Sequence, residues 1–278
     1  MLPVTWLYVP ADRPDRFAKA AASGADVVIL DLEDAVVPAH KAEARDNAVR
    51  WLRTAAPGTV APDSVEVRVN ALDTPWAQDD LRALSDVPAL RAVRLPKVQS
   101  AADVTAALAA LTAARSGLSC LIESARGVEA AYEIASSPRV TAIGLGEADL
   151  AADLGVTDAV GLAWCRSRIV VAARAAGLPA PAMSVYPHVA DLAGLHSSSL
   201  AGRRLGFLGR AAIHPRQVPV IAEAFRPSEA DVADAREVIK AFGRGVDDGS
   251  GVIALEDGRM IDMALIRQAR AVLDRAAP

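Results

Sequence analysis

An α/β fold of alternating strands and helices is predicted by three features of the sequence. Eight short apolar runs are rich in β-branched residues and bounded by glycine, proline or charge, as expected for buried parallel strands. Longer amphipathic stretches separate these runs. No G-x-G-x-x-G or Walker motif follows a strand. Eight strand–helix units in about 225 residues therefore favour a TIM (β/α)8 barrel over a doubly wound sheet.

The elements follow in order along the chain. The expected strands are Val4–Val9, Asp26–Leu32, Val65–Asn70, Ala92–Leu95, Leu118–Ile122, Ala142–Leu145, Ala182–Tyr186 and Gly206–Ile213. The expected helices are Arg13–Ser23, Ala39–Thr54, Ala77–Ser85, Ala101–Ser116, Val128–Ala135, Gly161–Ala176, Asp191–Ala201 and Pro215–Ala224. Pro38 suits a helix start, because the first turn tolerates its missing N–H. Gly24 and Gly177 suit helix ends.

Two domains are expected, a barrel over residues 1–226 and a C-terminal appendage over residues 227–278. Pro227-Ser228-Glu229 has the pattern of a linker that leads into a helix N-cap. The appendage is predicted to contain a helix, a glycine-rich turn, a short extended pair around Asp257-Gly258 and a second helix. The helices and the turn are Glu229–Phe242, Asp262–Ala276 and Gly243–Gly251.

Composition excludes several classes of protein. The 278 residues are 52% hydrophobic and carry a net charge of −4 without a basic stripe, so nucleic acid is not an expected partner. No apolar run approaches the roughly 18 residues of a membrane span, and MLPVTWLYVP lacks the charged head of a signal peptide. Cys120 and Cys165 form neither a disulfide framework nor a metal-type spacing. We expect a soluble, cytoplasmic protein.

Charged residues cluster where the predicted strands end. In a barrel of this type the active site lies at the C-terminal ends of the strands. The relevant residues are Asp31, Glu33 and Asp34 after the second strand, Arg68 and Asn70 on the third, Lys97 after the fourth, Glu123 and Arg126 after the fifth, Glu147 and Asp149 after the sixth, and His214 after the eighth. Several acids and an arginine would therefore converge on one mouth.

Glu123 and Asp149 follow consecutive strands. Neighbouring strands lie about 5 Å apart, so carboxylates at adjacent strand ends can share one cation. Two carboxylates with several water or substrate oxygens are a typical Mg²⁺ site. The alternative is that either acid caps the following helix or pairs with Arg126.

Arg68 occupies an inward-facing strand end, where its planar charge could hold a carboxylate or a developing oxyanion. The alternative is a structural ion pair with Glu33 or Asp31. The Asp31, Glu33 and Asp34 cluster could bind a second metal. We favour the simpler interpretation, in which it orients Arg68 and caps the helix that begins near Pro38.

Lys97 and His214 suggest further chemistry. A buried lysine at a strand end can form a Schiff base, as in some barrel aldolases. We favour an ion pair between Lys97 and an acid of the mouth. His214 could be a general base or a structural histidine. Trp6 and Tyr8 lie in the first strand, where packing accounts for them.

Ordered motifs along nearly the whole chain resemble the citrate-lyase β-subunit group of the HpcH/HpaI aldolase family. This family also includes malyl-CoA and citramalyl-CoA lyases. The matching motifs are LYVPADRPDRFAKA (7–20), VVILDLEDAV (27–36), VRVNAL (67–72), LPKV (95–98), LIESARGV (121–128), GLGEADLAADLG (144–155), GFLGRAAIHPRQVPVI (206–221) and DGRMIDMALIRQA (257–269).

The resemblance implies a TIM barrel whose C-terminal segment can reach a neighbouring subunit, commonly in a homotrimer. It implies Mg²⁺ held by Glu123 and Asp149, and substrate contacts from Arg68 and Glu123. Asp262 resembles the acid that completes a neighbour's site in some CoA lyases. Arg13, Arg16 and Lys19 lie where relatives receive the acyl-CoA.

These implications lead to one functional hypothesis. The enzyme is expected to be a Mg²⁺-dependent carbon–carbon lyase that splits a 3-hydroxy-acyl-CoA into an acyl-CoA and a 2-oxo acid such as oxaloacetate, pyruvate or glyoxylate, or joins them. Arg68 and Asp262 would be its catalytic residues. The alternatives are a Schiff-base aldolase using Lys97, malate synthase-like hydrolysis of the condensed thioester, and a non-catalytic protein that binds oxo acids.

Overall fold

The computed structural model describes residues 2–54, 64–87, 90–111, 116–247, 253–254 and 260–276. The chain divides into two compact units. One is Pro3–Ala224, and the other is Phe225–Pro278 together with Met1–Leu2.

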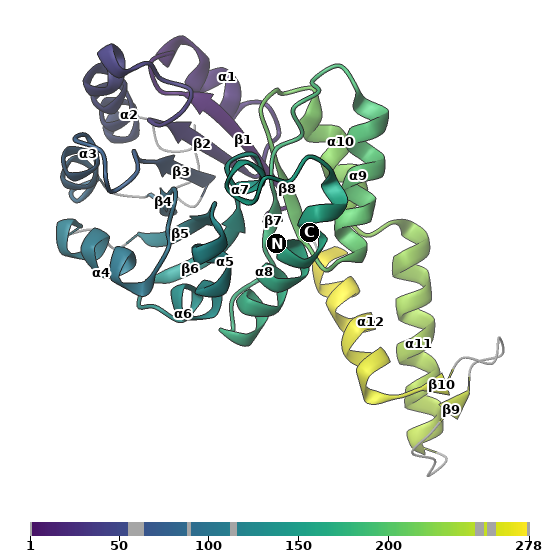
Figure 1. The fold of residues 1–278 in the computed structure, drawn as a ribbon. Helices are drawn as coiled ribbons and strands as arrows, with labels where there is room; N and C mark the ends of the chain where they lie inside the picture. The colour runs from purple at the N-terminus through teal and green to yellow at the C-terminus, as the bar shows by residue number, and fades with distance from the viewer. Residues whose placement is uncertain are drawn as a thin grey trace. The chain divides into compact units, whose positions relative to one another are not determined.

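Eight parallel strands form the centre of the larger unit, with helices around them (Figure 1). The strands are β1 (Thr5–Pro10), β2 (Val27–Asp31), β3 (Val65–Arg68), β4 (Ala92–Leu95), β5 (Gly117–Ile122), β6 (Val140–Leu145), β7 (Ala182–Met183) and β8 (Gly209–Ala212). The helices are η1 (Pro14–Arg16), α1 (Phe17–Ala21), η2 (Pro38–His40), α2 (Lys41–Thr54), α3 (Ala77–Leu84), α4 (Ala101–Ala110), α5 (Ala125–Glu129), α6 (Ala131–Ala135), α7 (Glu147–Leu154), η4 (Ala159–Leu162), α8 (Ala163–Ala175), α9 (Leu192–Arg204) and α10 (Gln217–Phe225).

The strand order is β6-β5-β4-β3-β2-β1-β8-β7, so the first strand pairs with the last and the sheet curls into a nearly closed barrel. The predicted TIM barrel is confirmed. Backbone pairing joins every neighbouring pair except β6 and β7. Ser184, directly after β7, bridges this gap with its side chain. Its hydroxyl donates to the carbonyl of Leu145 at the end of β6 and accepts from the N–H of Glu147 at 3.1 Å.

Strand composition explains the barrel core. All five residues of β2 are buried, as expected for a parallel strand covered on both faces. Polar side chains also fill the interior. Glu66 on β3 accepts hydrogen bonds from Arg94 at 2.6 Å and from the Trp6 indole at 3.2 Å. The burial of the Glu66–Arg94 pair is therefore compensated by a hydrogen-bond network that spans β1, β3 and β4.

Some boundaries differ from the prediction. Helix α7 is not among the predicted helices, because its EADLAADL sequence begins directly after β6 and has no side-chain cap. The predicted helix Val128–Ala135 is two short helices, α5 and α6, which meet at Ala130. Strand β7 is only two residues long, since the polar side chain of Ser184 takes over the pairing beyond Met183.

The smaller unit is built on helices α11 (Glu229–Asp247) and α12 (Met263–Ala276). Buried Val238, Ile261 and Ile266 belong to its apolar core. Strands β9 (Ile253–Ala254) and β10 (Met260–Ile261) pair antiparallel, while Asp257-Gly258 lies outside the described residues.

One expectation for this unit is wrong. The predicted turn from Gly243 does not interrupt the chain, because α11 continues to Asp247. A glycine inside a helix costs only about 1 kcal/mol, and the apolar face of α11 extends to partly buried Phe242, packed against the core of the unit. Within the described ranges, no helix is both long enough and apolar enough to cross a membrane.

Candidate active site

Arg68 is held in one orientation by the acids that end β2. Asp31 and Arg68 are opposite each other in the β2–β3 register, which places their side chains together. The Nε and Nη2 atoms of Arg68 each donate to a different oxygen of Asp31 at 2.7 Å. Its Nη1 lies 2.8 Å from Glu33 Oε2 and 3.3 Å from Asp34 Oδ2. The bidentate pairing with Asp31 fixes the plane of the guanidinium group.

The acidic cluster orients Arg68 as predicted, but it caps no helix. The two oxygens of Asp31 also accept from the N–H groups of Glu33 and Ala35, which folds the segment into a tight turn. The helix at Pro38 has Val37 at its N-cap and no side-chain cap. That part of the expectation was wrong, because the turn directs the carboxylates toward the mouth.

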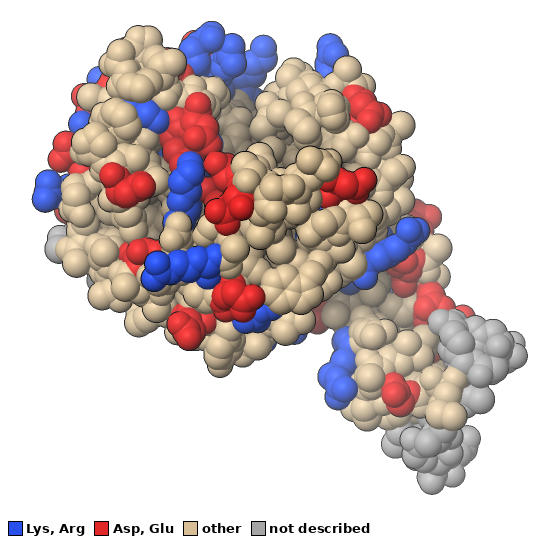
Figure 2. Space-filling view, in the orientation of Figure 1, with Lys and Arg blue, Asp and Glu red and all other residues tan. Residues whose placement is uncertain are grey.

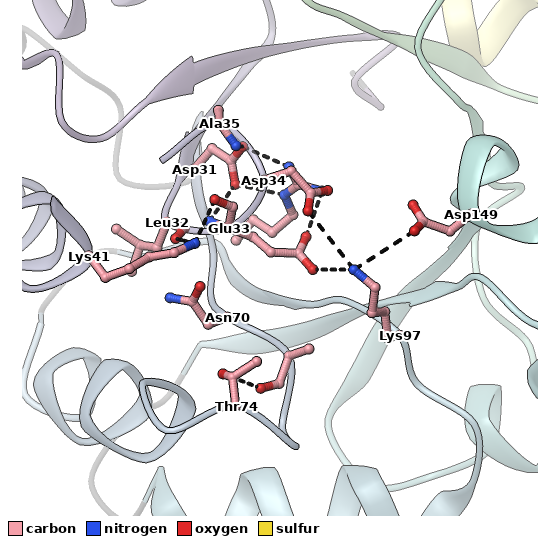
Figure 3. Close-up of polar contacts among 12 residues, drawn as sticks. Asp31, Leu32, Glu33, Asp34, Ala35, Lys41, Asn70, Thr74, Lys97 and Asp149 are labelled. Atoms are coloured by element: carbon pink, nitrogen blue, oxygen red, sulfur yellow. Dashed lines mark hydrogen bonds and ion pairs between the residues drawn. The ribbon is translucent and has the colours of Figure 1, made fainter. Parts of the chain in front are cut away.

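Lys97 reaches across the mouth from the end of β4. Its ammonium lies 2.9 Å from Glu33 Oε1, 4.0 Å from Asp34 Oδ1 and 3.9 Å from Asp149 Oδ1. Figure 3 shows the lysine between the acidic segment that ends β2 and Asp149. The backbone of Lys97 is left-handed, with φ 53°, which is uncommon for a residue with a side chain. The expected ion pair is confirmed.

These acidic neighbours stabilise the protonated, charged form of Lys97. Burial by itself would lower its pKa, but the hydrogen bond to Glu33 and the charges of Glu33, Asp34 and Glu123 raise the pKa above its ordinary value. A Schiff-base lysine needs the opposite shift, since only the neutral amine is nucleophilic.

Glu123 is a buried carboxylate with spare hydrogen-bonding capacity. It follows β5 directly and is only 6% exposed. Its Oε2 has no hydrogen-bond partner in the part of the chain that the structure describes. Burial, reinforced by the charge of Glu33, raises the pKa of Glu123 to about 8. A buried unpaired oxygen of this kind is unfavourable unless a ligand satisfies it.

The alternative roles of the two proposed metal ligands are not observed. Ser124, and not Glu123, caps helix α5 by accepting from the Gly127 N–H. Asp149 lies in the first turn of α7 without capping it. Among the described residues, neither acid makes an ion pair with Arg126; Asp149 faces Lys97 instead.

The cluster carries excess negative charge. Five carboxylates, Asp31, Glu33, Asp34, Glu123 and Asp149, surround two cations, Arg68 and Lys97. With all of them ionised the net charge is −3, and a divalent cation would offset most of it. In the described ranges, no three His, Cys, Asp or Glu side chains are arranged to hold a metal by themselves. The residues therefore fit an ion bound by two carboxylates, with remaining positions open to water or substrate.

Acidic side chains also lie beside a hollow on the barrel face shown in Figure 2.

Sequence reasoning missed one residue that shapes this mouth. Lys41 is buried, and its ammonium donates to the carbonyl oxygens of Leu32 at 2.8 Å and Glu33 at 2.7 Å. It clamps the turn that carries Glu33. A lysine in the first turn of a helix gives no sequence signal of this role.

Among the described residues, no hydrogen bond or ion pair joins the remaining candidates to these acids. Arg13, Arg16 and Lys19 are exposed on η1 and α1, and Arg13 pairs with Asp15 at 3.1 Å. His214 accepts from the N–H of Arg216 through Nδ1. Asp262 belongs to the smaller unit, where its Oδ1 accepts from the Leu265 N–H and caps helix α12.

A model of the HpcH/HpaI aldolase/citrate lyase family matches residues 5–215. The chain belongs to this family. The predicted membership is thus confirmed, and the matched segment contains all five carboxylates of the mouth.

Similar proteins share nearly the full length of the chain. An L-malyl-CoA/beta-methylmalyl-CoA lyase of Rhodobacter capsulatus is 36% identical to this chain. The matched region covers 97% of this chain and 93% of the lyase. The protein CitE of Mycobacterium tuberculosis, solved with magnesium, acetoacetate and coenzyme A, is 37% identical, with a TM-score of 0.81 over 99% of this chain and 98% of its own. A citrate lyase beta subunit of M. tuberculosis, solved with oxaloacetate and magnesium, is 37% identical, with a TM-score of 0.69 over 81% and 97%.

Proposed function

We propose that this protein is a Mg²⁺-dependent carbon–carbon lyase that converts a 3-hydroxy-acyl-CoA, with a carboxylate on the alcohol carbon, into an acyl-CoA and a 2-oxo acid, or catalyses the reverse. Its family includes lyases named for such thioesters, and a related structure holds magnesium with coenzyme A. The observation that carries the proposal is the buried, unpaired carboxylate of Glu123 beside Asp149 in an acidic mouth.

Glu123 and Asp149 would hold the metal. When bound there, Mg²⁺ would supply Lewis-acid polarisation of the oxo acid's carbonyl group. Glu123, which is buried, would also contact the substrate. Asp31, Glu33 and Asp34 would keep Arg68 in place instead of binding a second ion.

Arg68 and Asp262 would handle charge and protons. In the cleavage direction the substrate hydroxyl loses a proton and the carbon–carbon bond breaks. The electron pair passes to the thioester enolate, which then takes up a proton to give the acyl-CoA. Arg68 would stabilise the alkoxide or the enolate, where negative charge develops. Asp262 would move the proton.

A neighbouring subunit would supply Asp262, in a homo-oligomer that we propose to be a trimer. Asp262 is exposed and lies between two exposed apolar side chains, Met260 at 67% and Met263 at 50%. Exposed apolar side chains that lie together and are rimmed by polar residues are typical of a surface that meets another chain. Exposed Arg13, Arg16 and Lys19 would receive the phosphate groups of CoA.

A coupled assay over malyl-, citramalyl- and citryl-thioesters of CoA tests the function. We expect cleavage of at least one substrate, loss of cleavage on chelation, and its return with Mg²⁺. An acyl-CoA product identifies a lyase, whereas free CoA would indicate malate synthase-like hydrolysis. Turnover that persists with a chelator and yields a borohydride-trapped adduct on Lys97 would replace this proposal with the Schiff-base aldolase. Binding of oxo acid without turnover of any thioester would indicate a non-catalytic protein.

A further inference from the structure

Tyr8 on β1 lies between two arginines of the barrel interior. The guanidinium carbon of Arg68 is 5.0 Å from the centre of the Tyr8 ring, and that of Arg94 is 6.0 Å from it. Both distances lie within the range of cation–π attraction. Tyr8 therefore packs directly against the arginine that we propose to act on the substrate.

The exposure of Tyr8 shows which way it faces. Trp6 lies two residues earlier on the same side of β1, and it is 8% exposed with its indole N–H bonded to Glu66. Tyr8, one step nearer the C-terminal mouth, is only partly buried. Exposure thus increases along β1 toward the mouth, so the accessible part of Tyr8 faces the site and not the barrel floor.

The hydroxyl of Tyr8 has no hydrogen-bond partner among the residues that the structure describes. It is also accessible, because it is not one of the fully buried polar atoms that lack a partner. Tyrosine hydroxyls in buried surroundings usually find a partner. Burial also raises the pKa of Tyr8, against the lowering effect of Arg94 and Arg68, so the hydroxyl keeps its proton near neutral pH. An unused donor therefore borders the mouth beside Arg68.

Arg68 alone has little donor capacity left. Its Nε and Nη2 bond to Asp31, and its Nη1 faces both Glu33 and Asp34. A guanidinium group has five N–H donors. Most of them are already committed to carboxylates, so a substrate oxygen beside Arg68 needs a second donor to be fully satisfied.

We propose that the hydroxyl of Tyr8 is this second donor and hydrogen-bonds an oxygen of the bound 2-oxo acid next to Arg68. The proposal rests on the proposed function for the class of ligand. It makes Tyr8 a substrate-contacting residue that favours an oxygen atom over a methyl group at this position. It also accounts for a tyrosine at a place in the strand where packing alone would be served by phenylalanine.

The Tyr8→Phe variant tests this contact, because it removes the hydroxyl and keeps the ring beneath Arg68. Binding of oxaloacetate to the Mg²⁺-loaded protein is measured by calorimetry, and KM and kcat are measured for the best thioester. We expect oxaloacetate affinity to fall about tenfold or more, since hydrogen bonds to charged groups are among the stronger ones. The matched control is Tyr132→Phe, which alters an exposed tyrosine on α6. Both variants should melt at the wild-type temperature.

Oxaloacetate affinity of Tyr8→Phe within about twofold of the wild-type value would overturn the proposal, because the ring alone would then suffice. The binding readout separates this contact from the lyase assignment. Loss of affinity in Tyr8→Phe, with no thioester cleaved by the wild type, supports the contact and overturns the lyase function. Unchanged affinity with normal cleavage overturns the contact alone.

Discussion

Gly146 lies directly against the carboxylate of Glu123. A β-carbon placed on Gly146 would be 2.3 Å from Glu123 Oε1 and 2.6 Å from Cγ. The two residues are neighbours because the Gly146 N–H donates to the Ile122 carbonyl at the end of β5. Gly146 has an ordinary φ of −95°, so the glycine is needed for space and not for its backbone conformation.

Gly146→Ala should therefore displace Glu123 without straining the backbone. A catalytic group displaced by about 1 Å can lose on the order of a hundredfold in rate, so we expect a loss of that size in kcat and weaker Mg²⁺ binding. Gly144→Ala is the matched control, because a β-carbon there meets its nearest neighbour at an ordinary 3.6 Å. Equal activity of the two variants would show that the position of Glu123 does not matter.

Metal binding should release a proton from Glu123. Its pKa of about 8, raised by burial and by Glu33, means that the metal-free protein is largely protonated there at neutral pH. Mg²⁺ requires the carboxylate, so its affinity should fall by up to about tenfold per pH unit below pH 8. Calorimetry in buffers of different ionisation enthalpy measures the released proton. A binding enthalpy independent of the buffer would contradict this assignment.

The same pKa has a consequence for folding. A carboxyl group whose pKa is raised in the folded state contributes stability that is fully present below its ordinary pKa of 4.5, and this is lost as the pH rises through about 8. The metal-free wild type should therefore lose stability over this interval, and Glu123→Gln should lose less. Urea unfolding at a series of pH values compares the two slopes, with Glu133→Gln, at an exposed position of α6, as the control.

Arg68→Lys should keep the positive charge and lose the bidentate pairing with Asp31. Lysine cannot bond both oxygens of Asp31 while also facing Glu33. We expect kcat/KM to fall roughly a hundredfold, as for the loss of one oriented donor to a developing oxyanion. Arg82→Lys, at an exposed ion pair with Asp79, should have no effect. Full activity of Arg68→Lys would mean that positive charge alone suffices.

Mixed oligomers test the source of Asp262. Asp262→Asn and Glu123→Gln should each be nearly inactive alone. If a neighbour supplies Asp262, random co-assembly restores about a quarter of the sites, since each such site takes Glu123 from one subunit and Asp262 from the next. The activity of the purified mixture measures this fraction. No recovery on mixing would place Asp262 in the same subunit's site or outside catalysis.

Ser184→Ala should weaken the barrel where β6 meets β7. The change leaves the carbonyl of Leu145 and the N–H of Glu147 without this partner. Unfulfilled buried polar groups cost about 1 to 3 kcal/mol each, so the free energy of unfolding should fall by at least about 1 kcal/mol. Urea unfolding measures the loss, and Ser197→Ala on the exposed face of α9 is the control. An unchanged free energy would show that solvent replaces both contacts.

Hydrophobic patterning was sufficient to predict the barrel and the mouth. The prediction of β4 as Ala92–Leu95 matches the observed strand at both ends, because charge and proline bound it clearly. Arg68, Glu33, Lys97, Glu123 and Asp149 meet as expected, since parallel strands place their C-terminal ends together.

Other features depend on contacts between distant parts of the chain. Helix α7 begins without a side-chain cap, so its start carries no local signal. The clamp from Lys41 acts on backbone carbonyls, which leave no trace in a sequence pattern. Tyr8 could have been found, because its period-two relation to Trp6 places both inside the barrel.

The strand order also determines when the site can form during synthesis. The five carboxylates of the mouth, with Arg68 and Lys97, lie between positions 31 and 149, on or shortly after strands β2 to β6, which pair consecutively. Strand β7 has backbone pairing only with β8, which the ribosome makes later. We expect the five-strand segment to assemble its ion-pair network as a nascent chain, while β7 joins last together with β8. The five carboxylates of the mouth would then come together before the barrel closes.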